Sequence, residues 1–377
     1  MKHIVRNLSV LGCVGSSALA APFLAIGNNA ELFVTATGSA AYNDNILLGP
    51  SGSELQDTIF TLRPGFDLQF NKNATIQASL VGTATLTSYA DNSSLNNQLL
   101  GIGSNASYDG GSLSLNANAS FNQLDQATVD VVPTVGTLVE REVTAAGING
   151  ELAISEKISV GSGVSYSKTD YRTAGYADSE DYTVPVNVYY ELTPKVDVSA
   201  GVRYTRTETY GAGADQYDAF YYNVGARGAF TPKLSGSFSV GYNMRSASVG
   251  SDDKGSIGAE ASLAYAYTDK TQLTLDINRN FDNASVGGTS YENTAFTLGA
   301  SSAIAIDWTL TASATYRILE YNTYTNTYIE GSLGASYAIN SHLSAGLSYV
   351  YRQQTSDLGA GSEFNNNLIT LSLSARY

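Results

Sequence analysis

Apolar residues occupy every second position along most of the chain, from Leu32 to Tyr377. In one segment, for example, Val196, Val198, Ala200, Val202 and Tyr204 alternate with Asp197, Ser199, Gly201, Arg203 and Thr205. Successive side chains of a β-strand point to opposite faces, whereas the faces of a helix repeat every 3.6 residues. The pattern therefore predicts strands with one apolar and one polar face.

Short turn sequences interrupt these strands at regular intervals of roughly 34 to 38 residues, which indicates an internal repeat of one hairpin. Examples are Thr193-Pro194-Lys195 and Thr231-Pro232-Lys233. Longer polar segments alternate with the turns, around residues 47–56, 90–96, 123–140, 172–179, 210–217, 248–255, 285–290, 322–326 and 357–364. Nine long loops and eight short turns predict about eighteen strands of roughly 11 to 15 residues, long enough to cross a bilayer at a tilt.

An open sheet of this size would expose two strand edges and a large apolar face that no other segment of the chain can cover. Closing the sheet pairs every backbone group and lets lipid cover the apolar face. Blades of a propeller hold four short strands instead of two long ones. We therefore expect an all-β fold, a transmembrane antiparallel up-and-down β-barrel over residues 31–377, with short periplasmic turns and longer extracellular loops.

The composition agrees with a protein that does not face water everywhere. Only 14% of the 377 residues are charged, whereas soluble domains carry charge on about a quarter of theirs. The 34 Asp and Glu residues outnumber the 20 Lys and Arg residues, which gives a net charge of -14. Such an acidic chain lacks the basic surface that binds phosphates, so nucleic acid is not an expected partner.

The first residues have the features of a secretory signal. Lys2 and Arg6 precede a short apolar run, and Ala18-Leu19-Ala20 matches a cleavage site. Residues 1–20 are the expected signal peptide and residues 21–30 a short periplasmic segment. Cleavage would remove Cys13, the one cysteine; lipid attachment at Cys13 is the less favoured alternative, because the apolar run before it is short. The expected location is the outer membrane of a Gram-negative-type bacterium, among outer-membrane lipid and lipopolysaccharide.

The polar face of the strands carries sparse charges of both signs. We expect the following to line a pore: Arg63, Asp67, Glu191, Asp197, Arg203, Arg227, Arg245, Glu260, Asp276, Arg317, Glu330 and Arg352. A barrel of 16 to 18 strands leaves an aqueous channel, so small hydrophilic solutes would diffuse through it. Arg203, Arg227 and Arg245 lie on neighbouring strands and would form one wall of a constriction; alternatively, they are solvated charges paired with Asp197 or Glu260.

The longest predicted loop, residues 123–140, is unusually apolar. Its central part, Val129, Asp130, Val131, Val132, Pro133 and Thr134, would either fold into the channel and narrow it or extend the flanking strands as a hairpin. Acidic segments such as Asp178-Ser179-Glu180-Asp181 are expected in loops, where they are solvated or bind divalent cations between lipopolysaccharides.

Aromatic residues recur where a barrel meets the two membrane interfaces. They include Tyr42, Tyr204, Tyr242 and Tyr349 toward the long loops, and Phe230, Tyr267 and Trp308 toward the short turns. Small residues on the apolar face, Ala259, Ala261, Ala300 and Ala312, would permit close packing of subunits in a homo-oligomer.

The opening hairpin resembles a known family. Ala41-Tyr42-Asn43-Asp44-Asn45-Ile46, followed by Asp57-Thr58-Ile59-Phe60-Thr61-Leu62-Arg63-Pro64-Gly65-Phe66, is similar to the entry motif of the Putative beta-barrel porin families of Gram-negative outer membranes, particularly the second of them. The end of the chain, Ala375-Arg376-Tyr377, resembles the aromatic signal that the barrel-assembly machinery recognises, although Phe is commoner there than Tyr377. The resemblance implies the barrel fold and a porin function, but not the solute.

Enzyme chemistry finds little support in the residues. A Ser–His pair needs a nearby imidazole, yet His3 lies in the signal and His342 in a short turn. No Cys/His cluster has metal-ligand spacing, and no cofactor is expected. Two functions remain: a general or weakly selective porin, and a structural or export barrel serving polysaccharide secretion or adhesion through its loops.

Overall fold

A computed structural model describes residues 21–27, 29–72, 74–127, 138–211, 216–247, 253–283 and 290–377. Within these ranges the chain forms a short strand and eighteen long ones. The strands are β1 (Leu24–Ile26), β2 (Ala30–Asn43), β3 (Asp57–Phe70), β4 (Ile76–Tyr89), β5 (Asn97–Asp109), β6 (Leu113–Gln126), β7 (Val139–Ala153), β8 (Ile158–Tyr171), β9 (Asp178–Thr193), β10 (Val196–Tyr210), β11 (Gln216–Ala229), β12 (Leu234–Ala247), β13 (Lys254–Thr268), β14 (Thr271–Asn283), β15 (Ser290–Ala303), β16 (Trp308–Glu320), β17 (Thr325–Ala338), β18 (Leu343–Ser356) and β19 (Phe364–Arg376). Two 3-10 turns, η2 (Ser93–Leu95) and η3 (Ala360–Ser362), lie in loops.

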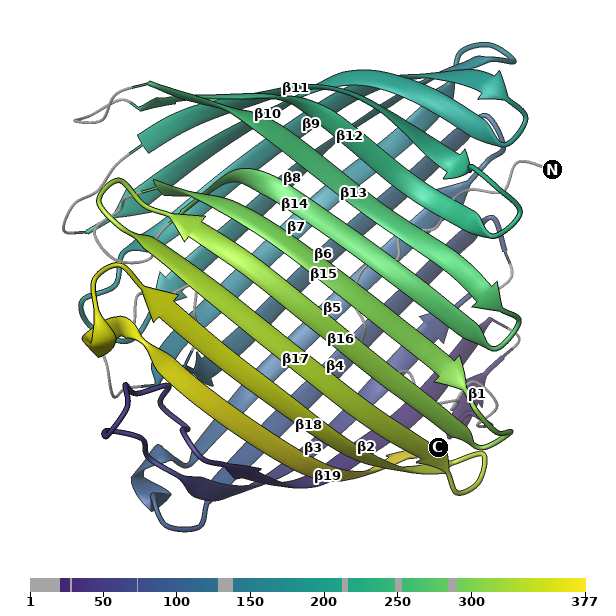
Figure 1. The fold of residues 1–377 in the computed structure, drawn as a ribbon. Helices are drawn as coiled ribbons and strands as arrows, with labels where there is room; N and C mark the ends of the chain where they lie inside the picture. The colour runs from purple at the N-terminus through teal and green to yellow at the C-terminus, as the bar shows by residue number, and fades with distance from the viewer. Residues whose placement is uncertain are drawn as a thin grey trace.

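The eighteen long strands close into a barrel. Each pairs antiparallel with the next along the chain, and β19 pairs with β2 from Leu368 opposite Asn43 to Arg376 opposite Thr35. Figure 1 shows the closed cylinder with its strands tilted across the axis. The predicted fold and strand number are confirmed, although the strands run to 13–16 residues, somewhat longer than expected. Among the described residues, no helix is long and apolar enough to span a membrane.

The two ends of the cylinder differ. At one end, which we call the short-turn end, the connections are brief, for example residues 194–195 between β9 and β10 and residues 269–270 between β13 and β14. At the other, the long-loop end, connections such as residues 44–56 between β2 and β3 are longer. This asymmetry is typical of outer-membrane barrels, in which the long loops face outward from the cell. The acidic segment at Asp178–Asp181 belongs to strand β9 and not to a loop, which corrects the sequence expectation.

The short strand β1 completes the junction between the first and last long strands. It pairs with the start of β2, from Leu24 opposite Leu32 to Ile26 opposite Ala30. The pairing of the chain end with β2 stops at Tyr377 and Val34, which exchange backbone hydrogen bonds of 2.7 and 2.9 Å. Strand β1 pairs with the residues of β2 that precede Val34.

The aromatic ring of Tyr377 is held at this junction. It stacks on His342 at 4.9 Å between ring centroids and contacts Phe23 edge-on at 6.4 Å. The residue that resembles an assembly signal is therefore also a packing residue of the finished barrel.

Large apolar side chains cover the outside of the cylinder. On β17, for instance, Leu333 is 61% exposed, and Ile329 is exposed on the same face. Alternation of exposed apolar residues recurs on β9, β11 and β12 through Val184–Val188, Phe220–Val224 and Phe238–Tyr242. Because exposed apolar surface of this extent does not occur on soluble monomers, it indicates contact with lipid.

Candidate functional site

The inner face of the barrel can be recognised from side-chain contacts that pass over intervening strands. Arg227 on β11 contacts Glu151 on β7, four strands away in the order of the sheet. Arg203 on β10 reaches Glu260 on β13. Only the concave side of a curved sheet brings such side chains together, so these residues project into the interior.

Cross-strand pairing extends this face around the barrel. Residues directly opposite each other in neighbouring strands share a face, so each inner residue identifies the next. All twelve charged residues predicted to line a pore share the inner face: Arg63, Asp67, Glu191, Asp197, Arg203, Arg227, Arg245, Glu260, Asp276, Arg317, Glu330 and Arg352. The prediction omitted Glu151, Asp57 and Tyr189, which share this face. The same alternation of inner and outer positions, applied along β3, β7 and β9, would have identified these three residues.

A dense charge cluster lies near the short-turn end. Both terminal nitrogens of Arg227 donate to the carboxylate of Glu151, at 2.8 and 2.7 Å, and its Nε donates to Asp197 at 3.1 Å. The guanidinium lies over the ring of Tyr189, 3.5 Å from its centroid. Such a two-pronged Arg–carboxylate contact fixes geometry as well as charge.

Two further ion pairs lie at the middle level of the wall. Arg203 donates to Glu260 at 2.6 Å and to Asn280 at 3.2 Å. On the other side, Arg352 donates to Glu330 at 2.9 Å. Each of these two arginines thus has an acidic partner, and at their level the charges are arranged as local pairs.

Two of the three arginines have the acidic partners that the second interpretation named. Arg203 is paired with Glu260, and Arg227 with Asp197. Arg245 differs, because it is buried and lies over the ring of Tyr217 at 4.5 Å. Arg63 is exposed, and its Nε donates to Thr85 at 3.2 Å.

At the long-loop end, inner-face side chains are buried. A side chain that faces an open lumen would be wetted, yet the following are nearly inaccessible: Thr207, Tyr217, Arg245, Tyr291, Leu319, Asn326 and Gln354. Nearby, the rings of Tyr321 and Tyr324 stack at 4.4 Å, and burial raises the pKa of Tyr324, which lies in the loop between β16 and β17. Loops and side chains therefore narrow the interior at this end.

The loop predicted to narrow the channel cannot be compared with the structure. Val129, Asp130, Val131, Val132, Pro133 and Thr134 lie outside the described residues, which resume at residue 138.

The predicted aromatic residues occupy both ends of the outer face. Tyr42, Tyr242 and Tyr349 are exposed toward the long loops, and Tyr267 and Trp308 toward the short turns. Tyr204 packs on Phe220 at 5.1 Å, and Phe230 packs on Phe238 at 5.6 Å.

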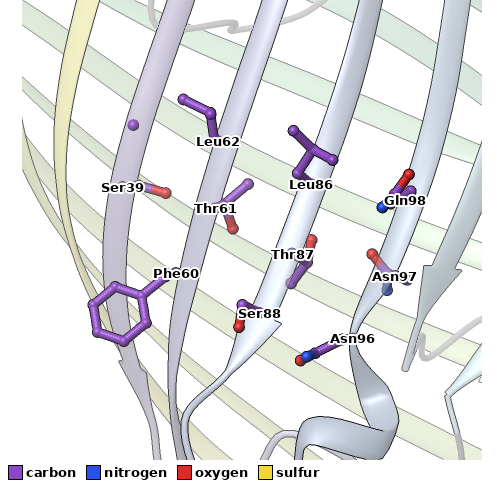
Figure 2. Close-up of a pocket in the computed structure, with 11 residues that line it drawn as sticks. Ser39, Phe60, Thr61, Leu62, Leu86, Thr87, Ser88, Asn96, Asn97 and Gln98 are labelled. Atoms are coloured by element: carbon purple, nitrogen blue, oxygen red, sulfur yellow. The ribbon is translucent and has the colours of Figure 1, made fainter.

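One pocket of about 590 Å³ lies in the wall at β2–β5, as Figure 2 shows. Its lining combines Phe60 and Leu86, which belong to the outer face, with Thr61 and Thr87, which belong to the inner face. The pocket is therefore a feature of the wall and does not follow the axis of the barrel. Among the residues that the structure describes, no group of three or more His, Cys, Asp or Glu side chains could hold a metal ion.

The fold and its two faces define a membrane β-barrel with an apolar exterior and a polar, charged interior. Residues 22–377 match the model of the family described as Putative beta-barrel porin 2, and the chain belongs to this family. A comparison with curated protein sequences finds no match.

Several solved outer-membrane proteins are similar to the chain. The outer membrane protein OpdK of Pseudomonas aeruginosa is 10% identical, with a TM-score of 0.48 over 92% of this chain and 99% of that one. OccAB4 of Acinetobacter baumannii is 10% identical, with a TM-score of 0.48 over 96% and 100%. The siderophore receptor PirA of Pseudomonas aeruginosa is 10% identical, with a TM-score of 0.46 over 91% of this chain and 80% of that one.

Proposed function

We propose that this barrel is an outer-membrane porin through which small hydrophilic solutes diffuse passively. The observation that carries the proposal is the inner wall: a closed ring of strands presents hydroxyls, amides and paired charges to the lumen, while the apolar side chains face outward. The exposed Arg63 at the middle level is consistent with water reaching the wall there. A wetted wall of this width supports diffusion without a binding step.

The pairing of inner charges suggests weak ion selectivity. Arg203 and Arg352 each contact one carboxylate within 2.9 Å, so the charges balance at their positions, whereas Arg227 contacts both Glu151 and Asp197, an excess of one negative charge. An ion passing such pairs meets short-range dipoles in place of a continuous field of one sign. We expect conduction of both cations and anions.

The experiment is reconstitution of the purified barrel in planar bilayers and in liposomes. Steady channels, together with liposome swelling that falls with increasing sugar size, would support a porin. A barrel that assembles in the membrane but gives neither conductance nor swelling would refute it.

A structural or export barrel is the second candidate, and the burial of inner-face residues at the long-loop end favours it. Leu319 and Gln354 are covered although they face the interior. If that end were closed at rest, the barrel would open only during export. Absence of steady current in the wild-type protein is the result that this alternative expects.

A further inference from the structure

The loop between β2 and β3, residues 44–56, turns inward over the mouth of the barrel at the long-loop end. Two of its apolar side chains, Ile46 and Leu48, are buried, with Leu48 only 7% exposed. Leu48 packs with Tyr328 and Phe364, which belong to the inner faces of β17 and β19. A loop that extended away from the rim could not make these contacts.

The packed cluster reaches across the opening. Ala127, which follows β6, packs against the cluster of Leu48, Tyr328 and Phe364. Tyr328 lies on β17, and Ala127 follows β6. In the order of the sheet, β17-β18-β19-β2-β3-β4-β5-β6, these two strands are seven steps apart in a ring of eighteen. Residues 44–56 therefore join nearly opposite parts of the rim.

Hydrogen bonds from Asn45 fix the fold of this loop. Its side-chain Oδ1 accepts from the backbone N–H of Gly49 at 2.8 Å, and its Nδ2 donates to the carbonyl of Gly49 at 2.7 Å. The same Nδ2 donates to the carbonyl of Asn365 at 2.9 Å. Gly49 is required here, because an added Cβ would lie 2.7 Å from the carbonyl oxygen of Ser53.

A second set of bonds ties the base of the loop to β19. The carboxylate of Asp44 accepts from the backbone N–H and the side-chain amide of Asn367, both at 2.6 Å. Asn366 donates to the backbone carbonyl of Asn45 at 3.2 Å. These contacts continue the junction of β2 and β19 beyond Asn43, the last residue of β2.

The buried amides leave the loop little freedom. Asn45 and Asn366 are fully buried, and a buried amide without partners would cost several kcal/mol. Here each is satisfied, and such networks make a structure rigid. Leu48 is held at a φ of 53°, a left-handed conformation that is uncommon for leucine and is retained where the surroundings over-determine it.

We propose that residues 44–56 form the constriction of this channel, with Leu48 at its inner tip, and that this segment sets the size limit for solutes. The inference rests on the proposed porin function. Because the segment is anchored by Asn45 and Asp44, it narrows the mouth permanently and does not open and close during transport.

The first test compares two leucine variants and one shortened loop in planar bilayers and liposome swelling. In the shortened variant, a Gly-Ser-Gly linker replaces residues 47–54, so that Asn45 and Asp44 remain. We expect its single-channel conductance to rise at least two-fold and larger sugars to enter. Leu48→Ser should give a smaller increase, and Leu358→Ser, a loop leucine that is 56% exposed, should behave as wild type.

The outcomes separate this inference from the porin proposal. If the wild type conducts and the shortened loop and Leu48→Ser leave conductance and size limit unchanged, the constriction is refuted and the porin proposal stands. If the wild type is closed and the shortened variant conducts, residues 44–56 plug the mouth, and the size-limit inference fails together with the porin proposal. If neither conducts, both proposals fail.

A cross-linking test needs no transport. The only cysteine of the chain lies at position 13, so Leu48→Cys with Phe364→Cys would introduce a unique pair in the barrel. A short bis-maleimide should join the two thiols in the assembled barrel. A control pair of Leu333→Cys with Phe364→Cys should not react, because Leu333 is exposed on the outer face of β17 whereas Phe364 is on the inner face of β19. If Leu48→Cys and Phe364→Cys each react with a maleimide as single variants but the pair does not cross-link, the inward position of the loop is refuted.

Discussion

The contact between Arg227 and Glu151 can be measured as a coupling free energy. Two parallel hydrogen bonds of 2.7 and 2.8 Å join strands that are four apart. We propose a double-mutant cycle with Arg227→Gln, Glu151→Gln and the double variant. Each single substitution also loses other contacts, such as that of Arg227 with Asp197. The cycle subtracts these losses and leaves the interaction of Arg227 with Glu151.

The structure gives the expected size of this coupling. Two unit charges about 4 Å apart near a protein surface attract by about 4 kcal/mol at an effective dielectric constant of about 20. The side chains of Arg227 and Glu151 are 26% and 30% exposed, so solvent screening, desolvation and side-chain ordering offset much of that attraction. We expect a coupling of about 1–2 kcal/mol, above that of a fully exposed pair.

The assay is reversible urea unfolding of the barrel in lipid vesicles, with Arg227→Lys as the matched control. Lysine keeps the charge but cannot form the two parallel bonds, so about half of the coupling should be lost. The Arg227→Gln variant should also shift permeability toward cations, because Glu151 and Asp197 keep their charges without the guanidinium. A coupling below about 0.3 kcal/mol would show that the contact across the interior does not form.

Three further predictions concern the two faces and the rim. Leu333→Arg on the outer face should lower the free energy of unfolding in lipid by about 2–4 kcal/mol, whereas Ser332→Arg, on the inner face of the same strand, should lower conductance with little effect on unfolding; equal stability losses would contradict the assignment of faces. Asp57→Ala should lower the free energy of unfolding by about 2–4 kcal/mol, because the Asp57 carboxylate accepts three backbone N–H bonds from residues 90–92; Asp57→Asn should lose less, and an unchanged urea midpoint for Asp57→Ala would count against it. Trp308, the one tryptophan of the chain, should be quenched most strongly by lipids brominated near the headgroup, and absence of quenching by any brominated lipid would contradict its place at the interface.

The sequence was sufficient for the architecture because its information is local. Alternation along Val196–Tyr204 indicates that the segment is a strand and which of its residues share a face. Short turns such as residues 194–195 indicate that the strands on either side of them are neighbours in the sheet. The inner position of each predicted pore-lining charge follows from the same two-residue alternation. What alternation cannot specify is which inner charges meet, because the contact of Arg227 with Glu151 depends on the curvature of strands that are far apart in sequence.

The inward course of residues 44–56 cannot be predicted from the sequence, for the same physical reason. The segment around Leu48 has the composition of an ordinary loop, and its inward course is determined by Asn365–Asn367, some 320 residues later. Apolar residues such as Leu319 on the polar face were a local sign of burial at that end. The acidic residues 178–181 have the composition of a loop, yet they form the first part of strand β9, because charge is also tolerated at the end of a strand that projects toward the rim.

The junction of β2 with β19 has a consequence for biogenesis. Until the final residues have been threaded into place, both margins of the sheet have unsatisfied amides and carbonyls, and in hydrocarbon those groups have no alternative partner. Each earlier hairpin can form from neighbouring sequence, but this last union requires the two extremes of the sheet to meet, a slow search for any chain. Removal of β19 would therefore leave an open sheet instead of a slightly smaller barrel, because β19 is the strand that pairs with β2.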